Sequence, residues 1–287
     1  MNNSSVPSFY EQLHALAMSY YSLPLFPVLY VVHSVIAGLH VRAQLGGVQF
    51  AMEHPLASFV GHFVVASAGG MSAALLLGNK SILMSVTLPN IIVSIIVWYL
   101  VFFSPLDVFY YLASTLPVKL LLSMLNEVRR SLNIMAGVVA ACAVFPPSLS
   151  YLLAISIIGT LKGSGSKWGI TVYQWIARLP DGAGKHELLQ VSLVTKASFV
   201  CAIVYTLNEL KVITFHREDL CLLTGILLIS LKLYCVLIAE VDPFLYPANT
   251  LWSLCTCVSP TRSNHHHHHS FADHSSNDGT SHKLKTS

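Results

Sequence analysis

Seven apolar runs of helix length divide most of this chain, and they constrain its fold more than any other feature. A helix crosses the hydrocarbon core of a bilayer with about 20 mostly apolar residues, whereas the strands of an outer-membrane barrel alternate over about 10. Of the 287 residues, 54% are hydrophobic and 10% are charged, compared with about 25% charged in a soluble domain. We predict an all-α membrane protein whose seven transmembrane helices are Leu23–Leu39, Leu56–Leu77, Ile82–Phe103, Leu116–Val138, Tyr151–Ile170, Leu193–Leu210 and Leu220–Ala239.

The order of the spans indicates an internal duplication. Three spans, three more and a last one fit two inverted three-helix repeats, at about residues 23–103 and 116–210, followed by a seventh helix at about 220–239. A repeat with an odd number of helices inserts upside down relative to its twin. We predict one membrane domain over residues 1–259 and a disordered, His-rich polar tail over residues 260–287.

Lysine and arginine are distributed unevenly between the two ends of the spans. One side holds Lys80, Lys211 and Arg217, and the other holds Arg42, Lys167, Arg178, Lys185, Arg262, Lys283 and Lys285. Cytoplasmic loops carry the excess of positive charge. The N-terminus is therefore predicted to face a lumen or the exterior, and the C-terminus the cytoplasm.

Glycines interrupt the second helix of each predicted repeat. They occur at Ala68-Gly69-Gly70 and at Gly163-Ser164-Gly165. Glycine-interrupted helices at matching positions of two halves are the best sequence indication of a transport site. The alternative is that these glycines only allow close helix packing. The correspondence between the two halves favours the transport interpretation.

A polar stripe runs along the fourth predicted span. Its members, at offsets 0, 4, 7, 11, 14 and 18, are Lys119, Ser123, Asn126, Arg130, Asn133 and Gly137. At about 100° per residue they lie within roughly 40° of one line along the helix. A charge at the centre of a membrane costs about 2.5–3.5 kcal/mol, so such residues normally face the bundle interior or a water-filled path. We predict that Arg130 lies at the constriction of a pore, whereas Lys119 either lines it or extends to the headgroups.

The fifth predicted span supplies partners for this stripe. Lys162 and Ser164 lie among the glycines there, where freed carbonyls would coordinate a cation or bond to Arg130, and amides with basic side chains would hold a phosphate. The pattern therefore fits either an ion path or an anionic lipid.

Enzyme and metal signatures are absent from the sequence. It has no Gly-x-Ser-x-Gly, no His-Glu-x-x-His, no phosphate-binding loop and no pair of acidic residues inside the spans. The six cysteines lie mostly in apolar runs, and Cys255-x-Cys257 has no matching second pair, so we expect no metal site. A net charge of +3 without a basic block gives no indication of nucleic-acid binding. A channel, a transporter and a membrane scaffold remain as classes.

Several segments together identify a family resemblance. They are PLFPV at Pro24–Val28, HPLAS at His54–Ser58, WYLVFFSPLDVFY at Trp98–Tyr110, LPVKL at Leu116–Leu120, NEVRR at Asn126–Arg130, KGSG at Lys162–Gly165 and TKAS at Thr195–Ser198. From the first span through the seventh, the chain resembles the trimeric intracellular cation (TRIC) channels.

The resemblance implies a homotrimer with a pore in each subunit, located in endoplasmic or sarcoplasmic reticulum and nuclear membranes. It implies potassium-permeable counter-ion flow that balances calcium release. It also implies a Lys-Glu-Val-x-Arg motif whose basic residues hold the headgroup of phosphatidylinositol 4,5-bisphosphate beside the pore. Here Glu127, Val128 and Arg130 match the motif, but Asn126 stands in place of its lysine, so we expect weaker lipid binding.

Our leading hypothesis is a monovalent-cation channel of this family, and the alternative is a secondary transporter with broken helices at the midplane. A lipid-binding subunit that conducts nothing is a third possibility. The predicted pore residues are Lys119, Ser123, Asn126, Arg130, Gly69, Gly70, Gly163 and Gly165. The predicted lipid-binding residues are Asn126, Arg129, Arg130, Lys162, Gly163, Ser164 and Gly165.

Overall fold

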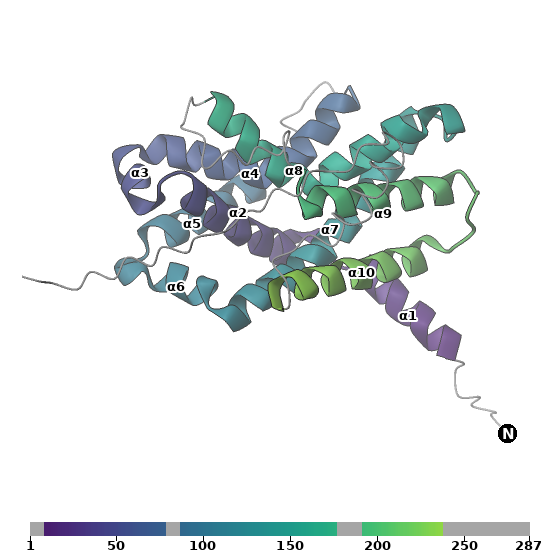
Figure 1. Cartoon of the computed structure of the whole chain (residues 1–287), viewed down its shortest axis with the longest axis horizontal. Coiled ribbons are helices and arrows are strands. Elements are labelled where there is room, and N and C mark those ends of the chain that lie inside the picture. The colour runs from purple at the N-terminus through teal and green to yellow at the C-terminus, as the bar shows by residue number, and fades with distance from the viewer. Residues whose placement is uncertain (1–8, 79–86, 177–190, 238–287) are drawn as a thin grey trace, which may run out of the picture. The chain divides into compact units, whose positions relative to one another are not determined.

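The computed structural model describes residues 9–78, 87–176 and 191–237, and these residues form helices and short connections without a β-strand. Lys80, Arg178, Lys185 and the predicted tail at 260–287 lie outside the described residues. Figure 1 shows the arrangement of the helices. Their bounds are α1 Phe9–Tyr21, α2 Tyr30–Gln44, α3 Gly47–Glu53, α4 Pro55–Leu76, α5 Leu88–Phe103, α6 Val108–Ser114, α7 Leu116–Val144, α8 Leu152–Ile176, α9 Leu193–Glu209 and α10 Arg217–Leu237.

The prediction of an all-helical protein is confirmed, and each of the seven predicted spans overlaps one long helix: α2, α4, α5, α7, α8, α9 or α10. Proline at the first turn starts three of them, α4, α5 and α7, where its missing N–H has no helical partner to lose. By length and composition, three described helical segments are able to cross a membrane, namely Leu25–Gln44, Pro55–Leu76 and Arg217–Leu237. Counting the bent pair of α5 with Pro105–Ser114 as one span gives a fourth.

The helices pack in two groups. α2, α4 and α5 contact one another, as do α7, α8 and α9, while α10 packs on α7. Two hydrophobic clusters form the core. Val41, Val65 and Phe102 belong to one, which also includes Tyr173 of α8, and Ile134 and Tyr205 belong to the other. α4 and α8 make the main contact between the groups.

The glycines in α4 and α8 do not break these helices, which corrects the interpretation of them as interrupted. Both helices continue through the glycines. A Cβ atom on Gly69 would lie 2.6 Å from the carbonyl oxygen of Lys162, and one on Gly165 would collide with the backbone of Gly69. The facing backbone fills the space of each missing side chain, so the helical hydrogen bonds remain and no carbonyl is freed.

The sequence analysis did not predict α1, α3 or α6. α1 lies against α10 (Figure 1), where the Tyr20 hydroxyl forms a 2.6 Å hydrogen bond with Ser131 Oγ of α7. His14 Nδ1 lies 2.9 Å from Asp219 Oδ1 of α10. Gly225 gives Tyr20 room, because a Cβ there would collide with the tyrosine hydroxyl. α1 is therefore bound to α7 and α10 by side chains that are distant in sequence.

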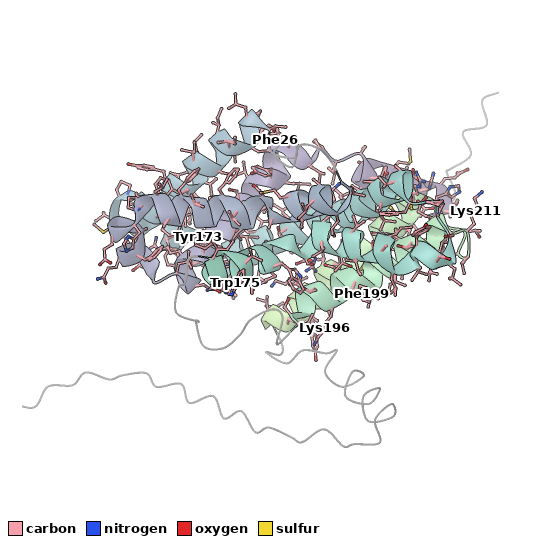
Figure 2. All side chains as sticks on the ribbon, turned by 90° about the horizontal axis from the view of Figure 1, so that it is seen from above. Phe26, Tyr173, Trp175, Lys196, Phe199 and Lys211 are labelled. Atoms are coloured by element: carbon pink, nitrogen blue, oxygen red, sulfur yellow. The ribbon has the colours of Figure 1, made fainter. Side chains whose placement is uncertain are left out.

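Exposed Lys211 and exposed Trp175 lie toward the two ends of the bundle, whereas Tyr173 near Trp175 is buried. Figure 2 shows Lys211, at the turn between α9 and α10, at the opposite end from Tyr173 and Trp175, which lie near the end of α8. The indole of Trp175 is 80% exposed.

Arg42 of α2 holds the sharp bend between α5 and α6. The bend, of 89°, contains two residues with positive φ, Leu106 and Asp107. Nη1 of Arg42 donates to the carbonyl oxygen of Val101 at 2.5 Å and to Asp107 Oδ1 at 3.1 Å, and Nη2 donates to Asp107 Oδ2 at 2.7 Å. The guanidinium carbon also lies 3.9 Å from the centre of the Tyr110 ring.

Replacing Arg42 with lysine should lower the thermal stability of the protein in detergent, because an ammonium cannot reproduce this fork of hydrogen bonds. The expected loss in unfolding free energy is about 1–3 kcal/mol. Arg217→Lys is the matched control, since Arg217 makes a similar two-bond pair with Glu209 but its side chain is 49% exposed. Equal losses for the two variants would contradict the role given to Arg42.

Candidate functional site

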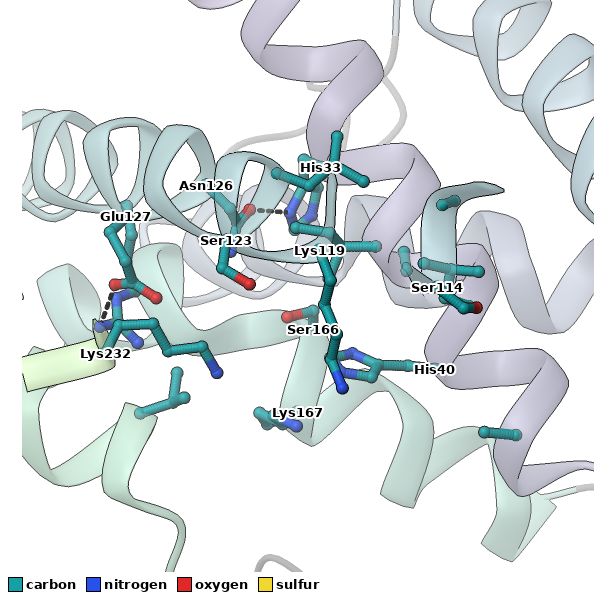
Figure 3. Close-up of a pocket in the computed structure, with 18 of the residues that line it drawn as sticks. His33, His40, Ser114, Lys119, Ser123, Asn126, Glu127, Ser166, Lys167 and Lys232 are labelled. Carbon is teal, nitrogen blue, oxygen red and sulfur yellow. Dashed lines mark hydrogen bonds and ion pairs between the residues drawn. The ribbon is translucent and has the colours of Figure 1, made fainter. Parts of the chain in front are cut away.

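The first half of the polar stripe on α7 lines a cavity of about 280 Å³. Four predicted pore residues line it, namely Lys119, Ser123, Asn126 and Arg130. Figure 3 labels the first three. The other walls come from α2, α6, α8, α9 and α10 through residues that include His33, His40, Ser114, Ser166, Lys167, Val194 and Lys232. We call this space the first cavity.

Basic side chains predominate in the first cavity. Lys119, Arg130, Lys167 and Lys232 line it, and Glu127 is the one carboxylate among its described lining residues. Glu127 and Arg130 form an ion pair within α7, and both are buried. Nε and Nη1 of Arg130 have no hydrogen-bond partner among the described residues. Among the described residues, Arg130 is thus paired with Glu127 of its own helix rather than with the α8 carbonyls that we predicted as its protein partners.

Asn126 is bound to a residue that the sequence analysis missed. Its Oδ1 lies 3.0 Å from Nδ1 of His33 on α2 (Figure 3). His40, seven residues further along α2, lines the same cavity. A spacing of seven places two side chains on one face of a helix, and this was the signal available in the sequence. The amide at the altered motif position is therefore engaged with α2.

A second cavity, of about 410 Å³, lies beside the later part of α7. Arg129 and Asn133 of α7, Lys162 of α8 and Gly70 of α4 line it. The remaining described lining residues are Leu25, Phe26, Tyr30, Ala66, Ser67, Ala73, Ala74, Leu77, Asn90 and Ala140.

The two cavities therefore divide four of the predicted lipid-binding residues between them. Arg129 and Lys162 face the second cavity, whereas Asn126 and Arg130 face the first. Successive side chains on a helix point about 100° apart, so neighbouring arginines reach different spaces. This corrects the single lipid site that combined all four.

The remaining predicted site residues are packing residues. Gly69 and Gly165 form the contact between α4 and α8, and Gly163 faces Ile134 of α7. Ser164 is buried, and its hydroxyl donates to the carbonyl oxygen of Thr160 at 2.8 Å. None of the four is among the lining residues of either cavity.

The two cavities follow one another along α7. The first is lined by α7 residues between 119 and 130, and the second by residues between 129 and 140. α2 passes the two cavities in the opposite chain direction, because Tyr30 lines the second cavity and the later residues 33–43 line the first. Arg129 and Arg130 lie where the two sets meet. This arrangement suits passage of small polar species along α7.

Known proteins are similar to this chain in sequence and fold. Residues 44–239 match the family model described as TRIC channel. Trimeric intracellular cation channel type 1B.2 of Caenorhabditis elegans is 36% identical over 200 residues, which cover 69% of this chain and 63% of that relative, slightly under two thirds of its length. The type A channel of Homo sapiens is 30% identical over 225 residues, covering 77% of this chain and 73% of the relative.

A solved structure agrees with these matches. The structure of a trimeric intracellular cation channel from C. elegans in the absence of Ca²⁺ has a TM-score of 0.73 and 33% identity, and it covers 81% of this chain and 99% of that chain. The family model spans more than half of the chain. The chain therefore belongs to the TRIC channel family and is an ion channel rather than an enzyme.

Proposed function

We propose that this protein is a potassium-permeable monovalent-cation channel of intracellular membranes, those of the endoplasmic or sarcoplasmic reticulum and the nucleus, and that it supplies counter-ion flow during calcium release. The observation that carries the proposal is the succession of two cavities along the polar stripe of α7. Membership of the TRIC family and the names of its relatives support cation conduction.

The proposed pore runs through each subunit along α7. Lys119, Ser123, Asn126 and Arg130 line its first part, and Gly70 lines its second part. Gly69, Gly163 and Gly165 shape the pore indirectly, because they bring α4, α7 and α8 close together. Three such subunits form a homotrimer, in keeping with the names of the relatives.

We retain the proposal of seven spans, built as two inverted three-helix repeats and a seventh helix within a domain at residues 1–259. The separate packing of α2, α4 and α5 and of α7, α8 and α9 supports this duplication. With the N-terminus in the lumen and the C-terminus in the cytoplasm, the later part of α2 points to the cytoplasm, so the first cavity opens to that side.

A phosphoinositide is the proposed lipid partner of the first cavity. Asn126 and Arg130 face it, together with Lys119, Lys167 and Lys232. Several cations around one space favour a polyanionic headgroup, and phosphoinositides lie in the cytoplasmic leaflet. This proposal no longer includes Gly163, Ser164 and Gly165, whose places are taken up by helix packing.

Recording from the purified protein in a planar bilayer tests the proposed function. A channel gives unitary current steps, and in a potassium chloride gradient the reversal potential should shift toward the value for potassium. A secondary transporter gives no unitary steps. Their absence from active, reconstituted trimers would overturn the channel, whereas a shift toward the chloride value would overturn cation permeation.

The ion pair on α7 should control the conductance. Arg130→Gln leaves the Glu127 carboxylate unpaired and should raise potassium conductance, whereas Glu127→Gln leaves the guanidinium unpaired and should lower it. Each change should exceed about twofold, because a unit charge about 6 Å from an ion changes its energy by roughly 3 kcal/mol at an effective dielectric constant of 20.

The double variant Glu127→Gln/Arg130→Gln removes both charges together and should lie between the two single variants. Lys283→Gln, outside the predicted membrane domain, is the control for loss of a positive charge. If the three α7 variants all conduct as the wild type does, Arg130 does not lie in the pore.

Restoring the motif lysine with Asn126→Lys should increase retention of phosphatidylinositol 4,5-bisphosphate in native mass spectrometry. A charge-assisted hydrogen bond to phosphate is roughly twice as strong as a neutral one. Arg130→Gln should reduce retention. If the lysine variant holds no more lipid than the wild type and the glutamine variant holds as much, the first cavity does not bind the headgroup.

A further inference from the structure

We propose that the second cavity is a binding site for a phosphate group, formed by Arg129 and Asn133 of α7 and Lys162 of α8. This site is separate from the first cavity, to which the phosphoinositide was assigned above. It requires neither conduction nor a lipid in the first cavity.

The charge of the second cavity calls for an anion. Arg129 and Lys162 both line it, and its described lining residues include no aspartate or glutamate. Two cations that share a space repel each other, and a cation inside a membrane bundle is costly without a counter-charge. An anion between them removes both penalties.

A buried amide indicates which kind of anion fits. The Asn133 side chain is 8% exposed, and its Nδ2 has no hydrogen-bond partner among the described residues. An amide NH₂ group only donates hydrogen bonds, so the missing partner is an acceptor. A phosphate group offers several acceptor oxygens and forms strong charge-assisted bonds with guanidinium and ammonium groups. The hydroxyl of Ser67 adds a further polar group to the wall.

The packing of α8 fixes the position of Lys162. A Cβ atom on Gly137 would lie 3.1 Å from Cβ and 3.3 Å from Cδ of Lys162. On the other side, a Cβ on Gly69 would lie 2.6 Å from the carbonyl oxygen of Lys162. Glycines of α7 and α4 thus hold the backbone and the aliphatic part of this lysine between them. A cation presented from a fixed position loses little conformational entropy on binding.

Calorimetric titration of the purified full-length protein with inorganic phosphate tests the site. Phosphate should bind, with chloride at matched ionic strength as the blank. Arg129→Gln should raise the dissociation constant at least about tenfold, since it removes charge-assisted bonds. Lys211→Gln removes one positive charge at the distant α9–α10 turn (Figure 2) and should leave binding unchanged.

Asn133→Asp gives a second, nearly isosteric variant. Its carboxylate should pair with the two cations and take the place of the ligand. Phosphate binding should then be lost, while thermal stability measured without phosphate should rise. Wild-type protein that binds no phosphate, or variants that all bind as tightly as the wild type, would overturn the proposal.

The source of the phosphate is distinguished by repeating the titration in nanodiscs with and without phosphatidylinositol 4,5-bisphosphate. If this lipid displaces inorganic phosphate from the wild type, and Arg130→Gln does not prevent the displacement, the second cavity holds a lipid headgroup. If it does not displace phosphate, the cavity holds the free ion. Either result is compatible with unitary cation currents or with their absence, so failure of this site and failure of the channel are separate outcomes.

Discussion

The backbone contact between α4 and α8 determines where the charges of this protein lie. Gly69 and Gly165 leave no side chain between the two helices. Because of this contact, Lys162 reaches the second cavity, whereas Ser166 and Lys167, one helical turn later, reach the first. The two glycines line neither cavity, but their contact fixes α8 in a position from which its side chains reach both. A side chain at either glycine would separate the helices and join or displace the two spaces.

α7 combines its charges in two different ways. Glu127 neutralises Arg130 within the same helix. An ion in the first cavity is therefore exposed to the field of this ion pair and to the charges of the lysines that line the cavity. Arg129 has no such carboxylate among the described residues that line the second cavity. In the proposed channel, a permeating cation would pass from the first cavity, whose positive charge is partly neutralised, to the second cavity, whose positive charge is not. A bound anion in the second cavity would reduce that difference.

The sequence was informative where periodicity or composition decides the structure. The long apolar runs predicted the helices, and the spacing of Lys119, Ser123, Asn126 and Arg130 correctly placed them on one side of α7. Pairings across the bundle were not predictable in the same way. Glu127 was identified as a residue of the family motif, yet whether it binds Arg130 or a neighbouring helix depends on the packing around it.

Glycine was the residue most open to misinterpretation. The same Gly-Gly or Gly-Ser-Gly pattern permits either an unwound helix or close packing of two intact ones, and the distinction depends on what faces it. For Gly69 the facing group is the backbone of α8. The bend at Leu106 and Asp107 was missed because their positive φ values are imposed from outside by Arg42. Leucine rarely adopts a positive φ, whereas aspartate does so more often than most residues.

The position of α1 has a consequence for how the protein is made. His14 and Asp219, which join α1 to α10, are 205 residues apart, and Tyr20 occupies the space left by Gly225. During synthesis, α1 leaves the ribosome before α10 and acquires these contacts only after α10 has been made. Until then Phe9, Tyr10 and Leu16, which remain more than half exposed even in the folded chain, depend on lipid or a chaperone. The contacts between α1 and α10 therefore form late in the assembly of the described bundle.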